Sequence, residues 1–113
     1  MKFRTPRQKD SGHLAYLREL SCCVCLDNTS TEAAHIRFTE PKVAKENPGM
    51  QQKPDDRFAV PLCGRHHREQ HSGNERAWWN GHEIDPHYLA LALYNVSGDV
   101  ERGEQIIRAH GHH

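Results

Sequence analysis

The sequence predicts a small α+β fold that is held together by zinc. Four potential zinc ligands fall into two pairs with the same two-residue spacing, namely Cys22 with Cys25 and Cys63 with His66. Thiolates and imidazoles at such spacing are typical of a closed, four-coordinate structural zinc site. Two short apolar segments, 33–38 and 58–62, are expected to be strands, and the second leads directly into the second ligand pair. Periodic apolar residues on both sides of the strands indicate helices.

The composition predicts a single domain that needs a metal ion or a disulfide for stability. The chain has 113 residues, of which 35% are apolar, and its mean hydropathy is −0.90. A chain this small and polar usually needs a disulfide or a metal to stabilise its core. No apolar run reaches the roughly 18 residues of a membrane span, and the N-terminus lacks the apolar stretch of a secretory signal. We therefore expect a cytoplasmic protein, in which the alternative of two disulfides is disfavoured.

Charge is unevenly distributed, although the formal net charge is zero. Residues 1–68 contain twelve Lys and Arg against eight Asp and Glu, whereas residues 69–113 contain three against seven. The basic part also contains all the candidate metal ligands except His71. This asymmetry favours a nucleic-acid partner, and the alternative is ordinary charge scatter on a solvated surface.

The first half of the chain is expected to contain one helix and one strand. Residues 1–10 are basic and polar, and we expect a flexible arm there. Leucines at three-residue spacing from Leu14 predict a short helix that begins at Ser11 or Gly12. Segment 39–57 is a long polar connection to the second strand, and such loops are often functional.

The second half is expected to be helical. A helix over 65–71 ends near Gly73, and residues 75–79 predict another helical turn. Asp85-Pro86 is a strong helix start, so C-terminal helices are expected over about 85–109, with a break at Ser97-Gly98-Asp99. Trp78 and Trp79 are expected in the core, and stacking on a nucleic-acid base is their alternative role.

Two further histidines suggest a second metal site. His67 and His71 lie four residues apart, so they share one face of the predicted helix and can bind one ion. Two protein nitrogens leave coordination positions open, which is what a catalytic ion requires. His35, in the first predicted strand, has an imidazole pKa suited to taking a proton from water near neutral pH. The three imidazoles are therefore expected to gather around one divalent ion.

These residues together resemble a known superfamily. Ala34-His35-Ile36-Arg37, followed by Val60-Pro61-Leu62-Cys63-x-x-His66-His67-x-x-x-His71, is similar to the HNH, or His-Me finger, nucleases. The likeness is greatest to small HNH-like proteins of phages and prophages, some of them linked to recombination. It covers roughly residues 11–95.

The resemblance implies a zinc-stapled ββα-metal core at about 33–73, within a single domain of residues 11–113 with flanking helices. It implies an endonuclease that hydrolyses phosphodiester bonds in DNA, with branched or single-stranded DNA as possible substrates. A phage or host recombination protein is a possible partner.

Individual roles follow from the same resemblance. His35 matches the general base at the end of the first strand, and His67 and His71 match the ligands of a catalytic Mg²⁺, Mn²⁺ or Zn²⁺ ion. The ligands of the structural Zn²⁺ are matched by Cys22, Cys25, Cys63 and His66. Cys23 is a competing thiol, but its spacing makes the pair of Cys22 with Cys25 the better one.

The sequence departs from the superfamily at two places. Ala34 stands where many members have an Asp or His that binds metal, and Asp55-Asp56-Arg57 stands in place of the middle Asn. Asp56 is expected to orient His35 or to complete the ion's shell. Candidate nucleic-acid contacts are the basic residues Arg37, Lys42, Lys45, Lys53, Arg65 and Arg68.

Two other functions fit parts of the pattern. A non-catalytic zinc module that binds DNA or a phage protein explains the four zinc ligands equally well. A metallo-hydrolase of a small phosphate ester is the third interpretation, but nothing in the sequence resembles a deep small-molecule site.

Overall fold

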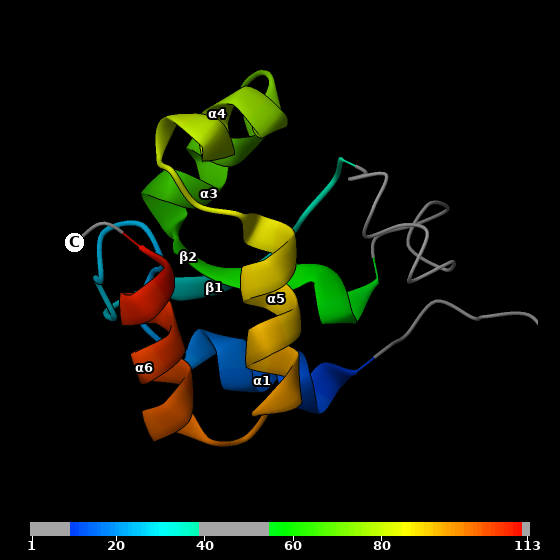
Figure 1. Ribbon diagram of the computed structural model, residues 1–113, viewed down its shortest axis with the longest axis vertical. Coiled ribbons are helices and arrows are strands. Elements are labelled where there is room, and N and C mark those ends of the chain that lie inside the picture. Colours follow the sequence, from blue (N-terminus) through cyan, green and yellow to red (C-terminus); the bar gives the residue numbers. More distant parts are fainter. Residues whose placement is uncertain (1–9, 39–54, 112–113) are drawn as a thin grey trace, which may run out of the picture.

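The computed structural model describes residues 10–38 and 55–111, and these form an α+β fold with a two-stranded sheet and five α-helices (Figure 1). Along the chain the elements are α1 (Ser11–Arg18), β1 (Thr31–His35), the 3-10 turn η2 (Asp56–Phe58), β2 (Ala59–Cys63), α3 (Gly64–His71), α4 (Glu75–Gly81), α5 (Pro86–Asn95) and α6 (Val100–His110). The predicted α+β class is confirmed. Residues 1–9 of the predicted arm and the lysines at 42, 45 and 53 lie outside the described residues.

The two strands pair antiparallel, with Thr31 opposite Cys63 and His35 opposite Ala59. The first strand begins and ends earlier than the predicted 33–38. The Ile36 N–H still donates to the Phe58 carbonyl at 2.9 Å, but Phe58 already belongs to η2. The Asp55 side chain caps that turn by accepting from the Arg57 N–H. This cap ends the ladder, because a 3-10 turn cannot continue strand pairing.

Four helices begin at a side chain that satisfies a backbone N–H of the first turn. These N-cap residues are Asp10 for α1, Asn74 for α4, Asp85 for α5 and Asp99 for α6. The predicted start at Asp85-Pro86 is confirmed, and so is the helix from Ser11. Asp10, expected at the end of the arm, is instead a structural cap.

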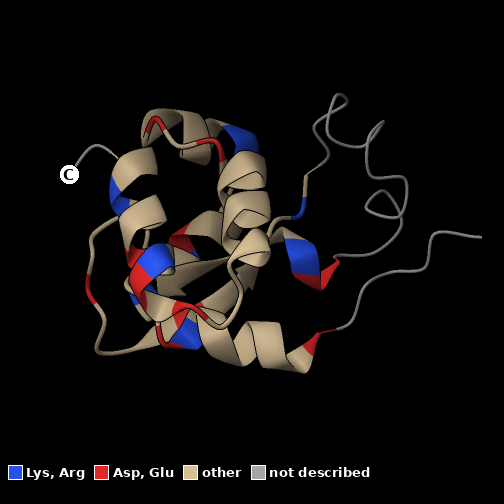
Figure 2. Cartoon of the chain, turned by 60° about the horizontal axis from the view of Figure 1, so that its bottom comes forward, with Lys and Arg blue, Asp and Glu red and all other residues tan. Residues whose placement is uncertain are grey.

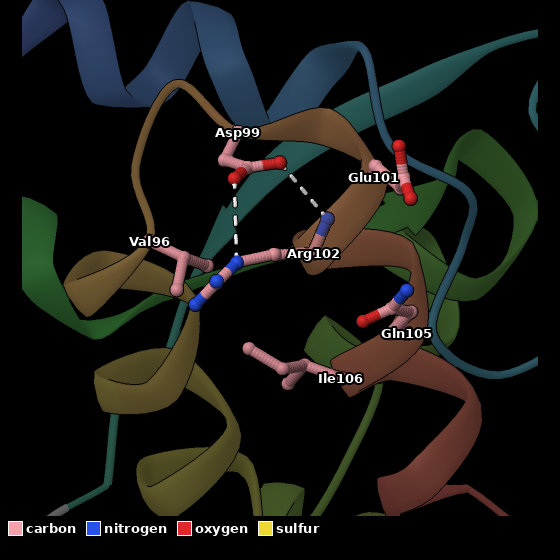
Figure 3. A pocket seen from close by; sticks show the side chains of 6 residues that line it. All are labelled: Val96, Asp99, Glu101, Arg102, Gln105 and Ile106. Carbon is pink, nitrogen blue, oxygen red and sulfur yellow. Dashed lines mark hydrogen bonds and ion pairs between the residues drawn. The ribbon is translucent and has the colours of Figure 1, made fainter.

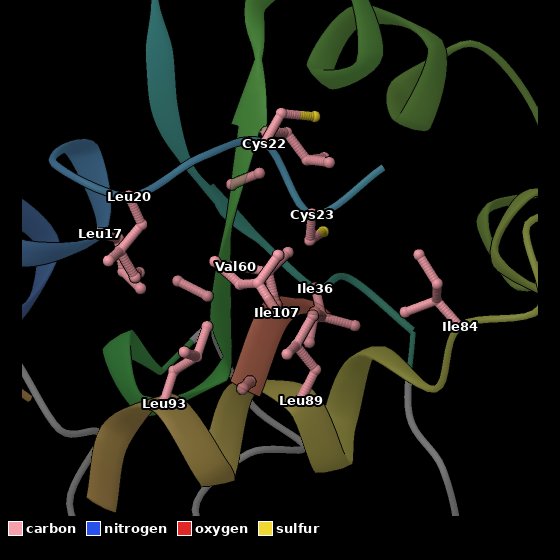
Figure 4. Close-up of a cluster of buried hydrophobic side chains, with 14 of the residues drawn as sticks. Leu17, Leu20, Cys22, Cys23, Ile36, Val60, Ile84, Leu89, Leu93 and Ile107 are labelled. Carbon is pink, nitrogen blue, oxygen red and sulfur yellow. The ribbon is translucent and has the colours of Figure 1, made fainter. Parts of the chain in front are cut away.

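Packing places β2 at the centre of the molecule. All five of its residues are buried, and α1, α3 and α5 each contact it. Figure 4 shows leucines of α1 and α5 meeting Val60 of β2 and Ile107 of α6 in one apolar cluster. In Figure 1, α3 and α4 lie at the opposite end of the molecule from α1. The strand therefore fixes α3 directly against the core.

Gly103 marks a close approach between α6 and α1. A Cβ built on this glycine would collide with the Tyr16 hydroxyl and touch Leu20, and that hydroxyl donates to the Asp99 carbonyl at 2.7 Å. We expect Gly103→Ala to lower the free energy of unfolding by about 1–2 kcal/mol, because the clash outweighs alanine's better helix propensity. Thermal unfolding followed by circular dichroism measures this.

Gly81→Ala is the matched control for this substitution, because nothing lies within 4 Å of a Cβ added at Gly81. It should leave the melting temperature unchanged or raise it. Equal melting temperatures for Gly103→Ala and the wild type would contradict the close packing of α6 on α1.

No helix in the described part of the chain is both long enough and apolar enough to cross a membrane.

Candidate metal centre

Four side chains from three parts of the fold meet at one point, and they are the four predicted zinc ligands. Cys22 and Cys25 come from the turn after α1, Cys63 is the last residue of β2, and His66 lies in the first turn of α3. Their ligand atoms all lie within 4.8 Å of one another. These four residues, called the zinc quartet below, lie close enough to bind a metal ion such as zinc.

The distances within the zinc quartet fit a tetrahedral ion. The Nδ1 atom of His66 lies 3.2 Å from the Cys63 sulfur and 3.7 Å from the Cys22 sulfur. The sulfurs of Cys25 and Cys63 are 3.9 Å apart. Around zinc with ordinary bond lengths, two sulfurs are about 3.8 Å apart and sulfur and nitrogen about 3.6 Å. All four cysteines are free thiols, so the disulfide alternative finds no support here.

The turn over residues 22–25 is shaped by backbone hydrogen bonds as well as by its ligand side chains. The Leu26 N–H donates to the Cys22 carbonyl at 2.8 Å, and Leu26 adopts a positive φ of 66°. The Cys23 N–H donates to the Pro61 carbonyl of β2 at 2.9 Å. This bond anchors the turn on the strand that also ends in Cys63, so both halves of the zinc quartet share one support.

Position determines which thiols suit a metal. Burial raises the pKa of Cys22 to about 11. Burial also acts to raise the pKa of Cys63, but hydrogen bonds, chiefly from the His66 N–H and the Cys25 thiol, outweigh it and hold that pKa below its usual value. Cys63 is the N-cap residue of α3, where free N–H groups favour a thiolate. Cys63 is therefore better prepared for metal binding than Cys22.

Cys23 is excluded from the zinc quartet. Its side chain is buried within the apolar core, where burial raises the pKa of its thiol well above the usual value. Figure 4 shows Cys22 and Cys23 on the same stretch of chain beside that apolar cluster. The preference for the pair of Cys22 with Cys25, based on spacing alone, is confirmed.

The other nitrogen of His66 faces a cation. An Nη atom of Arg65 lies 3.2 Å from Nε2 of His66. The ring of Trp78 lies 6.3 Å from that of His66. Burial, followed by the charge of Arg65, lowers the pKa of His66, which keeps its imidazole in the neutral form that binds metals.

His35 is held by a buried carboxylate. Its Nε2 atom lies 2.8 Å from Oδ1 of Asp56, and Oδ2 of Asp56 accepts from the Asp10 N–H at 2.7 Å. Asp56 is buried, whereas His35 is partly exposed. The ring is therefore oriented through Nε2, and Nδ1 is left as the nitrogen that can exchange a proton. Asp56 was expected either to orient His35 or to complete the ion's shell, and the structure shows the contact that orients His35.

His67 and His71 lie side by side on α3, as their spacing predicts. Their ring centroids are 4.9 Å apart. Nδ1 of His67 lies 2.7 Å from Oε1 of Glu32 on β1, a residue that the sequence gave no reason to select. Burial, then the nearby His67 and Arg37, lowers the pKa of His71, which favours a neutral, metal-binding imidazole.

The three imidazoles expected around one ion have separate partners. His35 contacts Asp56, whereas His67 contacts Glu32. Side chains three residues apart on a strand leave it on opposite faces, so Glu32 and His35 point away from each other. Among the residues that the structure describes, the zinc quartet is the only group of three or more potential ligands that meets at one point.

A single side chain nevertheless ties α3 to the end of β1. Nε2 of Gln70 donates to the His35 carbonyl at 3.1 Å and to Oε2 of Glu75 at 2.8 Å. Gln70 is buried. This contact fixes where α3 lies along β1, and with it His67, three residues before Gln70, and His71, the residue after it.

The tryptophans mainly serve packing. Trp79 is fully buried and donates to Oε2 of Glu75 at 3.0 Å, which confirms its predicted core position. Trp78 is partly buried and stacks edge-on against His82, with ring centroids 4.6 Å apart.

Positive charge in the described part of the chain comes from arginine alone (Figure 2). Arg65 and Arg68 line a hollow of about 510 Å³ that also borders Cys25, Cys63 and Glu32. The exposed Arg37 is fixed through its backbone N–H, which donates to Glu75 at 3.0 Å. Segments 1–9 and 39–54 contain all five lysines of the chain and two further arginines, against two acidic residues.

A second hollow, of about 500 Å³, lies where α5 meets α6 (Figure 3). Its polar residues include the pair formed by Arg102 and Asp99, whose charged groups approach to 3.6 Å. Asp99 also caps α6. Since capping explains this pair and no histidine or cysteine lines the hollow, we assign it no chemistry.

A family model described as a protein of unknown function, DUF968, matches residues 2–97. No curated protein matches the chain, and no solved structure does. The matched stretch includes the zinc quartet, His35, His67 and His71, and it extends over most of the sequence. The chain therefore belongs to the DUF968 family.

Proposed function

We propose that this chain is a metal-dependent endonuclease of the HNH type that hydrolyses phosphodiester bonds in DNA. Its active site would lie on a zinc-stapled ββα core. One observation carries the proposal: an antiparallel hairpin leads without a break into α3, with a carboxylate-held histidine at the end of β1 and a histidine pair on the helix. This is the order of parts that the sequence resemblance implies.

His35 is the proposed general base. Its bond to Asp56 orients the ring, and the carboxylate stabilises the imidazolium that forms when Nδ1 takes a proton from water. The hydroxide then attacks phosphorus, and the bond to the 3′ oxygen breaks. Asp56 is itself fixed by the Asp10 N–H, so the pair needs no rearrangement before it acts.

His67 and His71 are the proposed ligands of an exchangeable divalent ion. Such an ion supplies Lewis-acid stabilisation of the charge that grows on the phosphate and on the leaving oxygen. Because two imidazoles fill only part of a coordination sphere, room remains for phosphate oxygens and water. The ion's identity among Mg²⁺, Mn²⁺ and Zn²⁺ follows from the assay below.

Attraction to DNA comes from the basic segments. Residues 1–9 contain four Lys and Arg and no acidic residue, and Arg65 and Arg68 lie beside the zinc quartet. Contacts of this kind bind phosphates without reading sequence, so affinity should fall steeply with salt. Branched and single-stranded DNA are the substrates to compare with duplex DNA.

Plasmid nicking tests the proposal. Zinc-loaded protein should convert supercoiled plasmid to the open-circular form when Mg²⁺, Mn²⁺ or further Zn²⁺ is added, and not without an added ion. Metal analysis should find two ions per chain, one that resists mild chelation and one that exchanges. Absence of cleavage on duplex, branched and single-stranded DNA with every one of these ions would refute the proposed activity.

A non-catalytic zinc module that binds DNA is the second candidate. The separate partners of His35 and His67 favour it, since the zinc quartet is complete without either histidine. This function requires salt-dependent DNA binding by zinc-loaded protein, one tight ion per chain and no nicking. The same two measurements therefore separate the candidates.

A further inference from the structure

Glu32 is an acidic residue that reaches across from β1 to α3. Its Oε1 atom lies 2.7 Å from Nδ1 of His67, although the two residues are 35 positions apart in the sequence. The other carboxylate oxygen lies near Gly64, 3.4 Å from where a Cβ would stand on that glycine. Glu32 is thus placed at the first turn of α3, beside the histidine pair.

The histidine pair faces the same side of α3 as Glu32. His67 and His71 are one helical turn apart with ring centroids at 4.9 Å, so rotation of their side chains would bring one nitrogen of each to a common point, although the ligand atoms of Glu32, His67 and His71 do not meet there in the structure. Glu32 contacts the nearer of the two rings. One carboxylate and two imidazoles form a donor set typical of exchangeable divalent-metal sites that keep open positions.

Exposure distinguishes this group from the zinc quartet. The side chain of Glu32 is 52% exposed and that of His67 is 24% exposed, and His71 is also exposed. In the zinc quartet, by contrast, three of the four ligands are buried. A site on the surface loses and regains its ion easily, and its open positions face solvent and large substrates.

We propose that Glu32, His67 and His71 together bind a divalent ion on the exposed flank of α3, with Glu32 as the carboxylate ligand that Ala34 cannot provide. This inference rests on the part of the proposed function that places an ion on the histidine pair. It adds Glu32 as an acidic ligand. Glu32 lies two positions before Ala34 on β1, so the two side chains leave the strand on the same face. Mn²⁺ suits the site, because it accepts carboxylate and imidazole but competes poorly for thiolates.

Mn²⁺ titration of zinc-loaded protein tests the site without any need for catalysis. Electron paramagnetic resonance reports free Mn²⁺, so its signal should be suppressed until about one ion per chain is bound. Glu32→Gln removes the anionic ligand and keeps the shape, and we expect at least about a tenfold weaker Kd, as for loss of metal-site partners generally. His67→Ala should weaken binding at least as much.

Glu101→Gln on α6 is the matched control, because Glu101 is an exposed acidic residue remote from α3. It should bind Mn²⁺ like the wild type, and each variant should retain its zinc and its circular dichroism spectrum. Equal Kd for Glu32→Gln and the wild type would overturn the assignment, and so would absence of Mn²⁺ binding. Glu32-dependent binding without plasmid nicking would leave this site standing while the nuclease proposal failed.

Discussion

Cys25→Ser is expected to destabilise the protein more than Cys23→Ala, although Cys25 is exposed and Cys23 is buried. Serine does not replace a thiolate on zinc, so the first change removes one of four ligands. Structural zinc contributes about 10 kcal/mol or more in small zinc domains, comparable with the whole stability of a small domain. We expect Cys25→Ser to lower the free energy of unfolding by about 4 kcal/mol or more, a size of effect that point mutations reach when, for example, a bound metal is lost.

Cys23→Ala serves as the matched control for this change. The substitution removes only a sulfur that packs in the core, and a loss of about 1–2 kcal/mol is expected. Metal analysis should find one tightly bound zinc ion per chain in Cys23→Ala and little in Cys25→Ser. A strong chelator should lower the melting temperature of the wild type and of Cys23→Ala while changing that of Cys25→Ser little. The reverse ranking of the two variants would exclude the zinc quartet as the metal site.

His35→Ala is expected to abolish plasmid nicking while leaving the fold intact. The side chain is partly exposed and lies at the end of a strand, and Asp56, its buried partner, keeps the hydrogen bond from the Asp10 N–H, so the fold should persist at some cost in stability. Loss of a general base slows the reaction by about 10²–10⁴-fold. Initial nicking rates at saturating Mg²⁺ or Mn²⁺ measure this, with far-ultraviolet circular dichroism and zinc content as checks on folding.

Two further variants test whether the loss of nicking is specific to His35: Asp56→Asn changes its partner, and His110→Ala removes an unrelated histidine. Asn keeps the shape of Asp56 but not the charge that stabilises the imidazolium, so nicking should slow and its pH profile should shift. His110 contacts the Ile106 carbonyl of its own helix, and its removal should leave the nicking rate unchanged. Wild-type cleavage by His35→Ala would reject His35 as the base.

Local signals explain which parts of the fold were predictable. Asp85-Pro86 starts a helix through contacts within one turn, and the spacing of the zinc ligands reflects the short reach of one ion. The end of β1 was misjudged because it depends on η2, which lies beyond a long connection. Helix α4 continues to Gly81, past the predicted 79.

The candidate site was predictable only in part for the same reason. His67 and His71 are neighbours on one helix, so spacing alone brought them together. Glu32 gave no signal, since an exposed acidic residue on a strand is ordinary, and only the pairing of β1 with β2 carries it to the start of α3. An acidic residue two positions before Ala34, on the same strand face, is the pattern that would have indicated it.

The contact between Arg65 and His66 has a consequence for the filled zinc quartet. An imidazole that coordinates through Nδ1 carries its only proton on Nε2, which then donates and can no longer accept. Arg65 has donors alone, so a hydrogen bond from its guanidinium to Nε2, which lies 3.2 Å away, and coordination of an ion through Nδ1 exclude one another. Zinc and the guanidinium of Arg65 therefore compete for one imidazole, at the hollow that Arg65 shares with Arg68.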